Sequence, residues 1–388
     1  MNDVNPQSVF AGLLAAFVGF ASSFAVVLQG LRSVGATDDQ AASGLMIAAI
    51  SMGLCSIILS LKTKMPIGVA WSTPGAALLA SSAAFSGGFE TAVGAFIVCG
   101  FLLVLAGIWK PLGKAIEAIP SALASALLAG VLLTLCLAPF KAVAFKPWFG
   151  LPIIIAWVIG GRVNRMLAVP FALLAFIAVV LIGVEFPADW KATLSDKLIP
   201  SPEWVTPVFS IEAMFSIALP LFIVTMASQN IPGIAVLKAN NYETPASPLI
   251  TATGVFSILG SFLGSHAVNL SAIVAAMMAS EEGGKDPKKR YIAAVFFGVG
   301  SIILGIFAGV TTAFVSLAPV ILIEAVAGLA LVAAFSGSAV TAFKEDASRP
   351  AAAVTFLAAA SGMTLFGVSG AFWGLLAGYG MILLNRSK

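Results

Sequence analysis

Long runs of apolar residues follow one another along almost the whole chain, separated by short polar segments. Runs of 18 or more such residues can cross a bilayer as helices, so the pattern predicts an all-α polytopic membrane protein. Hydropathy predicts fourteen membrane segments, seven on each side of a polar stretch at 185–208. Their expected ranges are 8–31, 41–61, 65–86, 89–109, 115–139, 148–160, 164–184, 209–236, 246–262, 264–280, 291–313, 317–336, 350–366 and 369–385.

The third segment is interrupted by the sequence WSTPG, which suits the middle of an apolar helix poorly. Ser72 or Thr73 is a good N-cap, and Pro74 suits a first helical turn because its missing N–H is not needed there. We therefore predict extended backbone before the cap and a helix from Gly75 to about Phe85. Such a helix is only half as long as the bilayer is thick.

The tenth segment has a similar break. We expect extended backbone over 264–268, Asn269 or Ser271 as the cap, and a helix to about Ala279. Seven segments per half place the second half upside down, which is the inverted-repeat architecture of many transporters. The chain then enters the two breaks from opposite sides, and the two half-helix N-termini are expected to meet at the midplane.

Weak sequence similarity between the two halves of the chain supports the inverted repeat. The sequence IPSALASALLAGVLL at 119–133 resembles APVILIEAVAGLAL at 318–331, at an offset of 198 to 199 residues. An offset of 197 places residues 71–74 on residues 268–271, which begin the two broken segments.

The basic residues predict the orientation. With a cytoplasmic N-terminus, five of the 20 lysines and arginines fall outside, which leaves 15 on the cytoplasmic side, as the positive-inside rule requires. Both termini are then cytoplasmic. The N-terminus has no basic n-region, so the first apolar run is expected to be a retained span. The five external residues are Arg32, Lys141, Lys146, Lys191 and Lys197.

Composition agrees with a membrane protein and excludes several other classes. Hydrophobic residues make up 60% of the chain and charged residues 10%, with a mean hydropathy of +1.06. A net charge of +3 with scattered basic residues argues against nucleic-acid binding. One histidine, three dispersed cysteines and no nucleophile motif predict no metal site, no cofactor and no enzymatic activity.

The two facing helix N-termini predict an anion site. Each exposes unpaired N–H groups and the positive end of a helix dipole, which is costly in hydrocarbon unless something pairs with them. An anion between the two ends satisfies both. The alternative is a kinked helix whose freed groups bond to serine and threonine side chains.

Four stretches resemble a known family. AWSTPGAALLA, IPSALASALLAGVLL, TMASQNIPG and GSHAVNLSAIVAAM are similar to the benzoate/proton symporter family (BenE), and the resemblance covers essentially the whole chain. That family resembles the nucleobase–ascorbate and sulfate permeases, which have 7+7 inverted repeats divided into core and gate domains. The resemblance implies elevator-like movement of core against gate, often in a homodimer. It implies a core of 1–112 and 209–314, a gate of 113–184 and 315–388, and an external linker at 185–208.

Two departures from the nucleobase permeases concern the pocket. Gln229 takes the place of the glutamate that contacts the base in those proteins. The acid expected after the tenth segment's cap is also missing, since Ala272, Ile273 and Val274 stand there. Loss of fixed negative charge argues against a nucleobase and is what an anionic substrate requires.

The expected substrate-binding residues surround the two breaks. Each has an alternative: Gln229 and Asn230 could hold helices together, and the aromatic and serine residues could be ordinary packing. The carboxylate is expected between the two N-termini, with the ring against Trp71 or Phe20. The full set is Phe20, Ser22, Ser23, Trp71, Ser72, Thr73, Gly75, Gln229, Asn230, Asn269, Leu270 and Ser271.

Two titratable residues are candidates for proton coupling. His266 is the only histidine and precedes the second half-helix, although it could be a packing residue. Glu324 is flanked by apolar residues in a gate segment, where an interfacial carboxylate is the alternative.

The sequence thus favours an inner-membrane transporter that imports benzoate or a similar aromatic carboxylate with a proton. A permease for another small anion or a nucleobase, and an anion channel or uniporter, are the rivals on the same fold. Besides the substrate, the proton and a second copy of the chain, the lipid bilayer is an expected partner.

Overall fold

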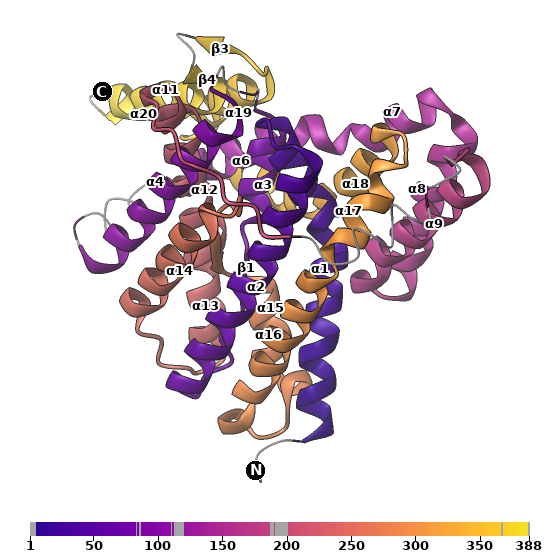
Figure 1. Cartoon of the computed structure of the whole chain (residues 1–388). Helices are drawn as coiled ribbons and strands as arrows, with labels where there is room; N and C mark the ends of the chain where they lie inside the picture. The colour runs from indigo at the N-terminus through magenta and orange to yellow at the C-terminus, as the bar shows by residue number, and fades with distance from the viewer. Residues whose placement is uncertain are drawn as a thin grey trace.

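The computed structural model describes residues 5–82, 84, 87–109, 111, 120–186, 190, 201–365 and 368–386, and it is helical nearly throughout (Figure 1). Seven of the described helical stretches are long and apolar enough to cross a membrane. Four are the helices α1 (Pro6–Ser33), α2 (Asp38–Thr63), α4 (Gly88–Ile108) and α18 (Val320–Ala342). The other three are composite: α6 (Ser121–Cys136) with α7 (Ala138–Phe145), the stretch of α11 (Ile211–Ala213), α12 (Leu219–Thr225) and α13 (Ile231–Ala239), and the stretch Pro287–Ile306 that ends in α16.

Five shorter apolar helices and two broken segments complete the fourteen predicted segments, and the predicted fold class is confirmed. The short helices are α8 (Pro147–Val163), α9 (Ala168–Gly183), α14 (Ala246–Ser261), α19 (Arg349–Ala360) and α20 (Gly370–Arg386). The broken segments are β1 (Val69–Trp71) with α3 (Thr73–Ala80), and β2 (Val268–Leu270) with α15 (Ala272–Ala279).

The two broken segments meet through backbone pairing. Strands β1 and β2 are antiparallel, and Ala70 lies opposite Asn269 at the centre of the ladder. The half-helix caps Ser72 and Ser271 are 199 positions apart. The prolines that cap α6 and α18, at positions 120 and 319, are also 199 apart. One offset therefore relates both pairs, and the offset of 197 for the broken segments was wrong by two residues.

Equivalent side chains support the two strands. Ser56 of α2 accepts the Val69 N–H at 2.9 Å, and Ser257 of α14 accepts the Val268 N–H at 3.0 Å. All four residues are buried. In each strand, one N–H outside the ladder is thus satisfied by the helix that precedes the strand, in the same way in both repeats.

The half-helix α3 is shorter than predicted. It ends at Ala80, where the Ser81 and Ser82 hydroxyls both donate to the Leu78 carbonyl at 2.8 Å. Serine side chains compete in this way with helical bonding, which explains the early end. Phe85, the predicted end, lies outside the described residues.

Two other predicted elements differ from the structure, and part of the linker cannot be compared. The eleventh segment is divided at Phe307 into α16 (Tyr291–Ile306) and α17 (Ala308–Ser316). A hairpin of β3 (Thr364–Leu365) and β4 (Val368–Ser369) precedes α20. Positions 187–189 and 191–200 of the linker lie outside the described residues. Its last part packs on the helices, with the Val208 N–H bonded to the Glu90 carbonyl at 2.9 Å.

The helices form two packing groups. In one, α14 packs on α4, α2 packs on α16, and α1 packs on both α16 and α3. In the other, α6 packs on α18 and α19, while α8 packs on α9, the pair at the right of Figure 1. The groups meet where α1 contacts α18 and α3 contacts α6.

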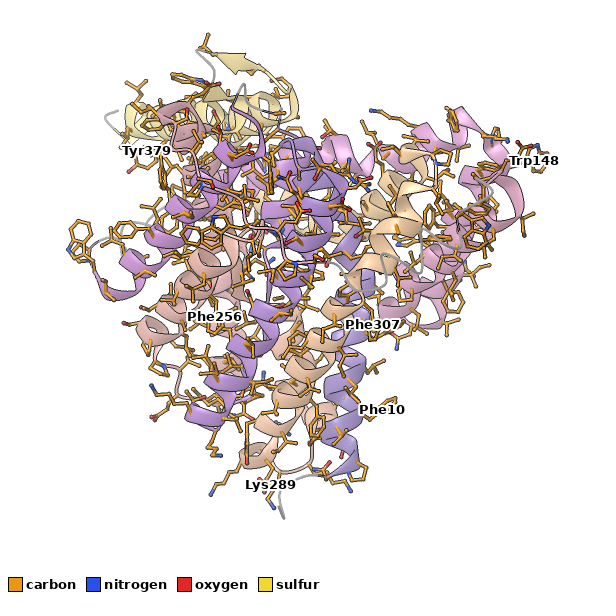
Figure 2. All side chains as sticks on the ribbon, viewed as in Figure 1. Phe10, Trp148, Phe256, Lys289, Phe307 and Tyr379 are labelled. Atoms are coloured by element: carbon orange, nitrogen blue, oxygen red, sulfur yellow. The ribbon has the colours of Figure 1, made fainter. Side chains whose placement is uncertain are left out.

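Large apolar side chains cover the outside of the molecule. Phe10 is 68% exposed and Trp148 82% exposed, and both project outward in Figure 2. In water such a surface would aggregate, whereas lipid covers it favourably. Lys289 lies at the end of the molecule that also carries the N-terminus, in a loop with several charged residues.

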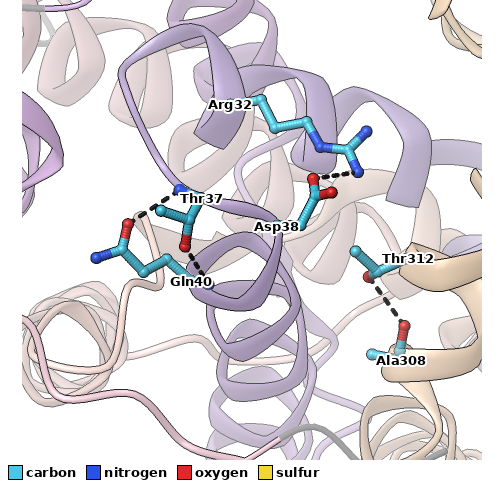
Figure 3. A network of polar contacts seen from close by, with 6 residues as sticks. All are labelled: Arg32, Thr37, Asp38, Gln40, Ala308 and Thr312. Atoms are coloured by element: carbon cyan, nitrogen blue, oxygen red, sulfur yellow. Dashed lines mark hydrogen bonds and ion pairs between the residues drawn. The ribbon is translucent and has the colours of Figure 1, made fainter. Parts of the chain in front are cut away.

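At the end of α1, Arg32 pairs with Asp38 at 2.7 Å (Figure 3). The same figure shows the capping box of α2. The Thr37 hydroxyl accepts the Gln40 N–H, and the Gln40 side chain accepts the Thr37 N–H. These bonds fix the turn between the first two helices.

We predict that Ser257→Ala lowers the free energy of unfolding by about 1–3 kcal/mol, because the Val268 N–H then lacks an acceptor in a buried site. The measurement is thermal unfolding in detergent. Ser301→Ala is the control, since its buried hydroxyl bonds only to the Phe297 carbonyl of its own helix at 2.8 Å. Equal losses in the two variants would contradict the role given to Ser257.

Candidate functional site

The two half-helices begin at equivalent serine caps. The Ser72 hydroxyl accepts the Gly75 N–H at 3.1 Å, and the Ser271 hydroxyl accepts the Val274 N–H at 3.3 Å. The backbone of both caps is paired with the opposite repeat. The N–H of Ser72 bonds to the Ala267 carbonyl, and that of Ser271 bonds to the Gly68 carbonyl, both at 2.9 Å. Each half-helix start is therefore fixed by its own serine and by the other repeat.

The caps leave three backbone N–H groups without an acceptor in the described part of the chain. They belong to Thr73 at the start of α3 and to Ala272 and Ile273 at the start of α15. Pro74, which has no N–H, occupies the position in α3 that Ile273 occupies in α15. The start of α15 thus offers two donors to an anion and the start of α3 offers one.

A cavity of about 500 Å³ lies at these helix starts, between the two packing groups. This volume is typical of small-molecule pockets, about 300–1,000 Å³. Pro74, Ala272 and Ile273 bring the two half-helices to it. The rest of the lining comes from α6, from α18 and from the eighth segment, where α12, α13 and the turn Met226–Asn230 between them all contribute. No charged side chain of the described residues lines it. Its polar side chains are Ser121, Ser125, Ser228, Gln229, Ser338 and Thr341.

The eighth segment reaches the cavity through an irregular helix. Two π-helical turns, Met214–Ala218 and Met226–Asn230, interrupt it, although the sequence pattern predicted a continuous span. A proline follows each turn, at positions 220 and 232, and removes an N–H that a regular α-helix would use. The prolines were the available signal for these turns, which often occur at functional sites.

Gln229 and Asn230 lie in the second π-helical turn but point to different surroundings. Gln229 is half-buried and lines the cavity, where its amide can reach a ligand. Asn230 is fully buried, and its carbonyl oxygen accepts the Leu270 N–H of β2 at 2.8 Å. Asn230 therefore holds the strand that precedes the second cap and acts on the cavity through it.

His266 is fully buried next to the first cap. Its Nε2 atom lies 3.1 Å from the Ser72 carbonyl oxygen. A carbonyl only accepts, so Nε2 carries the hydrogen of this bond. The Nδ1 atom has no partner among the described residues. The position equivalent to His266 in the first repeat is Ile67, so the two broken segments differ in sequence at this position.

Trp71 packs against α1. Its indole N–H donates to the Ser23 hydroxyl at 2.8 Å, and the Phe20 ring lies edge-on to it at 5.4 Å. The Ser22 hydroxyl donates to the Gly19 carbonyl of its own helix at 3.0 Å. Phe20 lines a different, apolar cavity of about 260 Å³, together with Phe176 of α9. The structure thus does not bring these aromatic residues together with Gln229 in one cavity.

The remaining predicted site residues, Gly75 and Asn269, lie in the two broken segments and pack within the structure around them. A Cβ atom at Gly75 would lie 2.7 Å from the Ser72 hydroxyl and would overlap Leu221 of α12, so glycine permits the close approach of that helix. The Asn269 amide nitrogen donates to the Leu270 carbonyl at 2.9 Å, while its buried oxygen has no partner in the described part of the chain. The gate-side serines and Thr341 were missed, because small polar residues in an apolar helix carry little signal without a partner helix.

Three comparisons bear on the family and the fold. The model of the family described as "Benzoate membrane transport protein" (BenE) matches residues 2–384. "Inner membrane protein YdcO" of Escherichia coli is 37% identical over 97% of this chain and 95% of the relative. "Benzoate membrane transport protein" of Acinetobacter baylyi is 30% identical over 97% and 94%. The solved transmembrane domain of "a cyanobacterium bicarbonate transporter BicA" has the same fold, with a TM-score of 0.61, 13% identity and coverage of 97% and 98%.

We predict that Asn230→Leu lowers the melting temperature in detergent, whereas Gln229→Leu does not. The first change leaves the buried Leu270 N–H without an acceptor, at a cost of about 1–3 kcal/mol. The second removes an amide that bonds to no described residue. Equal stability of the two variants would contradict the structural role of Asn230, and a large loss in Gln229→Leu would contradict its placement at the cavity.

Proposed function

The chain belongs to the benzoate membrane transport family, and on this basis we propose that it imports benzoate, or a similar aromatic carboxylate, together with a proton. Members of the family are membrane transporters and not enzymes. The observation that carries the proposal is the cavity at the starts of α3 and α15. Ala272 and Ile273 line it, and their backbone N–H groups have no acceptor in the described part of the chain; no charged side chain of the described residues competes for a carboxylate.

The lining suits a small aromatic acid. The carboxylate lies at the N–H groups of Ala272 and Ile273, where the dipole of α15 favours negative charge. Gln229 and the serines donate further hydrogen bonds, and the alanines of α6, α15 and α18 accept the ring. Trp71 and Phe20 support the site from behind the strand instead of contacting the ring, since neither lines this cavity.

Proton coupling rests on two candidates. The Nδ1 atom of His266 is available to take a proton, and its Nε2 atom already bonds to the first cap. Glu324 lies on α18, at the boundary between the two packing groups. One proton per carboxylate makes the cycle electrically silent, so an inward pH gradient drives uptake.

The moving parts follow the two packing groups. We propose that the core carries the two half-helices past the gate, so that the cavity opens to each side in turn. We propose that the protein lies in the inner membrane with both termini cytoplasmic and assembles as a homodimer. The proposed core is 1–112 and 209–314, and the proposed gate is 113–184 and 315–388.

Ala272→Pro tests the backbone site directly. Proline suits the first position of a helix, and the extended backbone of Ser271 (φ −111°, ψ 121°) is what a following proline requires. The variant therefore folds normally but lacks one N–H. We expect the KM for benzoate uptake in proteoliposomes to rise about tenfold, as for loss of a hydrogen bond to a charged group. Ala272→Ser retains the N–H and is the control; equal KM values in both would exclude this N–H from the site.

Gly337→Leu tests the position of the cavity. A Cβ atom at Gly337 of α18 would have no heavy atom within 4 Å, so a larger side chain extends into the cavity without displacing the backbone. We expect a loss of most benzoate uptake at an unchanged or higher melting temperature. Gly380→Leu on α20, which also has open space but does not line the cavity, keeps its uptake. Normal uptake by Gly337→Leu would place the substrate elsewhere.

A further inference from the structure

A second polar cavity, of about 300 Å³, lies between the same two packing groups. Helices α3, α6 and α18 line both cavities, each at two different positions along its length. On α3, Pro74 lines the first cavity and Ser81 the second, and on α18, Ser338 lines the first and Glu324 the second. The second cavity is lined by Gln29, Ala80, Ser81, Thr134, Leu135, Ala138, Lys141, Glu324, Ala359, Ala360 and Gly362.

A dry layer separates the two cavities. It consists of 76–79 of α3, 129–132 of α6 and 325–329 of α18, and the apolar side chains in these ranges are at most 5% exposed. Small residues allow close helix contact here; a Cβ atom at Gly328 would lie 2.9 Å from Pro139. The two cavities are therefore in series along the core–gate contact, with a closed layer between them.

The second cavity differs from the first in carrying charge. Lys141 and Glu324 are its only charged side chains among the described residues. No described residue forms a hydrogen bond or an ion pair within 4.0 Å with either group. The buried Oε1 atom of Gln29 also lacks a partner in the described part of the chain.

The elements packed against Glu324 bring few other charges. Helix α1 carries Arg32 one turn beyond Gln29, but Arg32 pairs with Asp38 (Figure 3). Helices α9 and α17 have no titratable side chain, and the Cys136 thiol of α6 is buried and does not line the cavity. The arginines of α8 and α19, Arg162 and Arg349, do not line the cavity either. Lys141 is thus the cation that determines what the cavity attracts.

We propose that this cavity is a second carboxylate-binding site, where the substrate anion docks at Lys141 before it reaches the dry layer. The inference rests on the proposed function for the identity of the anion. The Ser81 and Thr134 hydroxyls supply further donors. On the predicted topology the cavity faces outward, because Lys141 and the end of α1 are external.

Glu324 links this site to protons. An ionised Glu324 competes with the substrate for Lys141, whereas a protonated Glu324 leaves Lys141 free and can donate to the Gln29 carbonyl oxygen. Proton binding and anion binding then favour each other, as linkage requires. External acid therefore lowers the KM for the anion.

Uptake kinetics provide the first test. Lys141→Met is expected to raise the KM for benzoate about fivefold at low ionic strength, with less effect in high salt. Lys146→Met is the control, because Lys146 lies over the Phe149 ring at 4.0 Å and does not line the cavity. Glu324→Gln is expected to give a low KM that no longer depends on external pH. Equal KM values for the two lysine variants, or an unchanged pH dependence in Glu324→Gln, would overturn the proposal.

A second test needs no benzoate transport. Ser81→Cys places an exposed thiol in the cavity, while the native cysteines, Cys55, Cys99 and Cys136, are buried. The rate of modification by an anionic methanethiosulfonate, relative to a cationic one, is expected to fall about fivefold when Lys141→Met is added and to rise when Glu324→Gln is added. An unchanged ratio would overturn the anion site.

Protection of this thiol separates the anion site from the proposed function. Protection by benzoate in the Ser81→Cys background, lost with Lys141→Met, supports docking of the proposed substrate. The other outcome is that the ratio of anionic to cationic modification rates changes with both Lys141→Met and Glu324→Gln, while benzoate does not protect the Ser81→Cys thiol. That outcome supports an anion site but contradicts benzoate as its ligand. The proposed function then fails separately from the electrostatic inference.

Discussion

The antiparallel pairing of β1 with β2 is the interaction on which the rest of the structure depends. A helix broken inside a membrane exposes backbone groups that hydrocarbon cannot satisfy. Here each break satisfies the other, since the Ser72 N–H bonds to the Ala267 carbonyl and the Ser271 N–H to the Gly68 carbonyl. Serines of the preceding helices complete the pairing. At the two helix starts, the N–H groups of Thr73, Ala272 and Ile273 have no acceptor in the described part of the chain, and the pairing brings these donors close to one another.

Departures from the internal symmetry give the site its chemistry. The first repeat has Ile67 and Ala70 where the second has His266 and Asn269, and each of the latter has one buried atom without a described partner. Pro74 has no N–H, whereas its equivalent in α15 has one. A symmetric scaffold thus presents an asymmetric pocket. The start of α15 has two N–H groups without a described acceptor and the start of α3 has one, and the His266 ring bonds to the cap of α3.

The sequence was informative wherever a backbone requirement restricted the residue type. Serine caps, Pro74 and the apolar periodicity predicted both broken segments and the repeat, because few residues satisfy a helix start inside a membrane. The π-helical turns, the early end of α3 and the hairpin before α20 depend on tertiary packing and were not predicted. The same holds for the site: Gln229 stands out in the sequence and lines the cavity, but the lining from α6 and α18 requires knowledge of which helices face each other.

The proposed cycle carries a carboxylate through this cavity, and an inward proton gradient drives its accumulation inside. The most direct measurement is uptake of labelled benzoate into proteoliposomes, with and without an inward pH gradient and an uncoupler, corrected for leak into protein-free vesicles. The account predicts accumulation above equilibrium that the uncoupler abolishes and that unlabelled benzoate, but not uracil or sulfate, competes away. Equilibration without accumulation, or no uptake beyond the protein-free control, would contradict it.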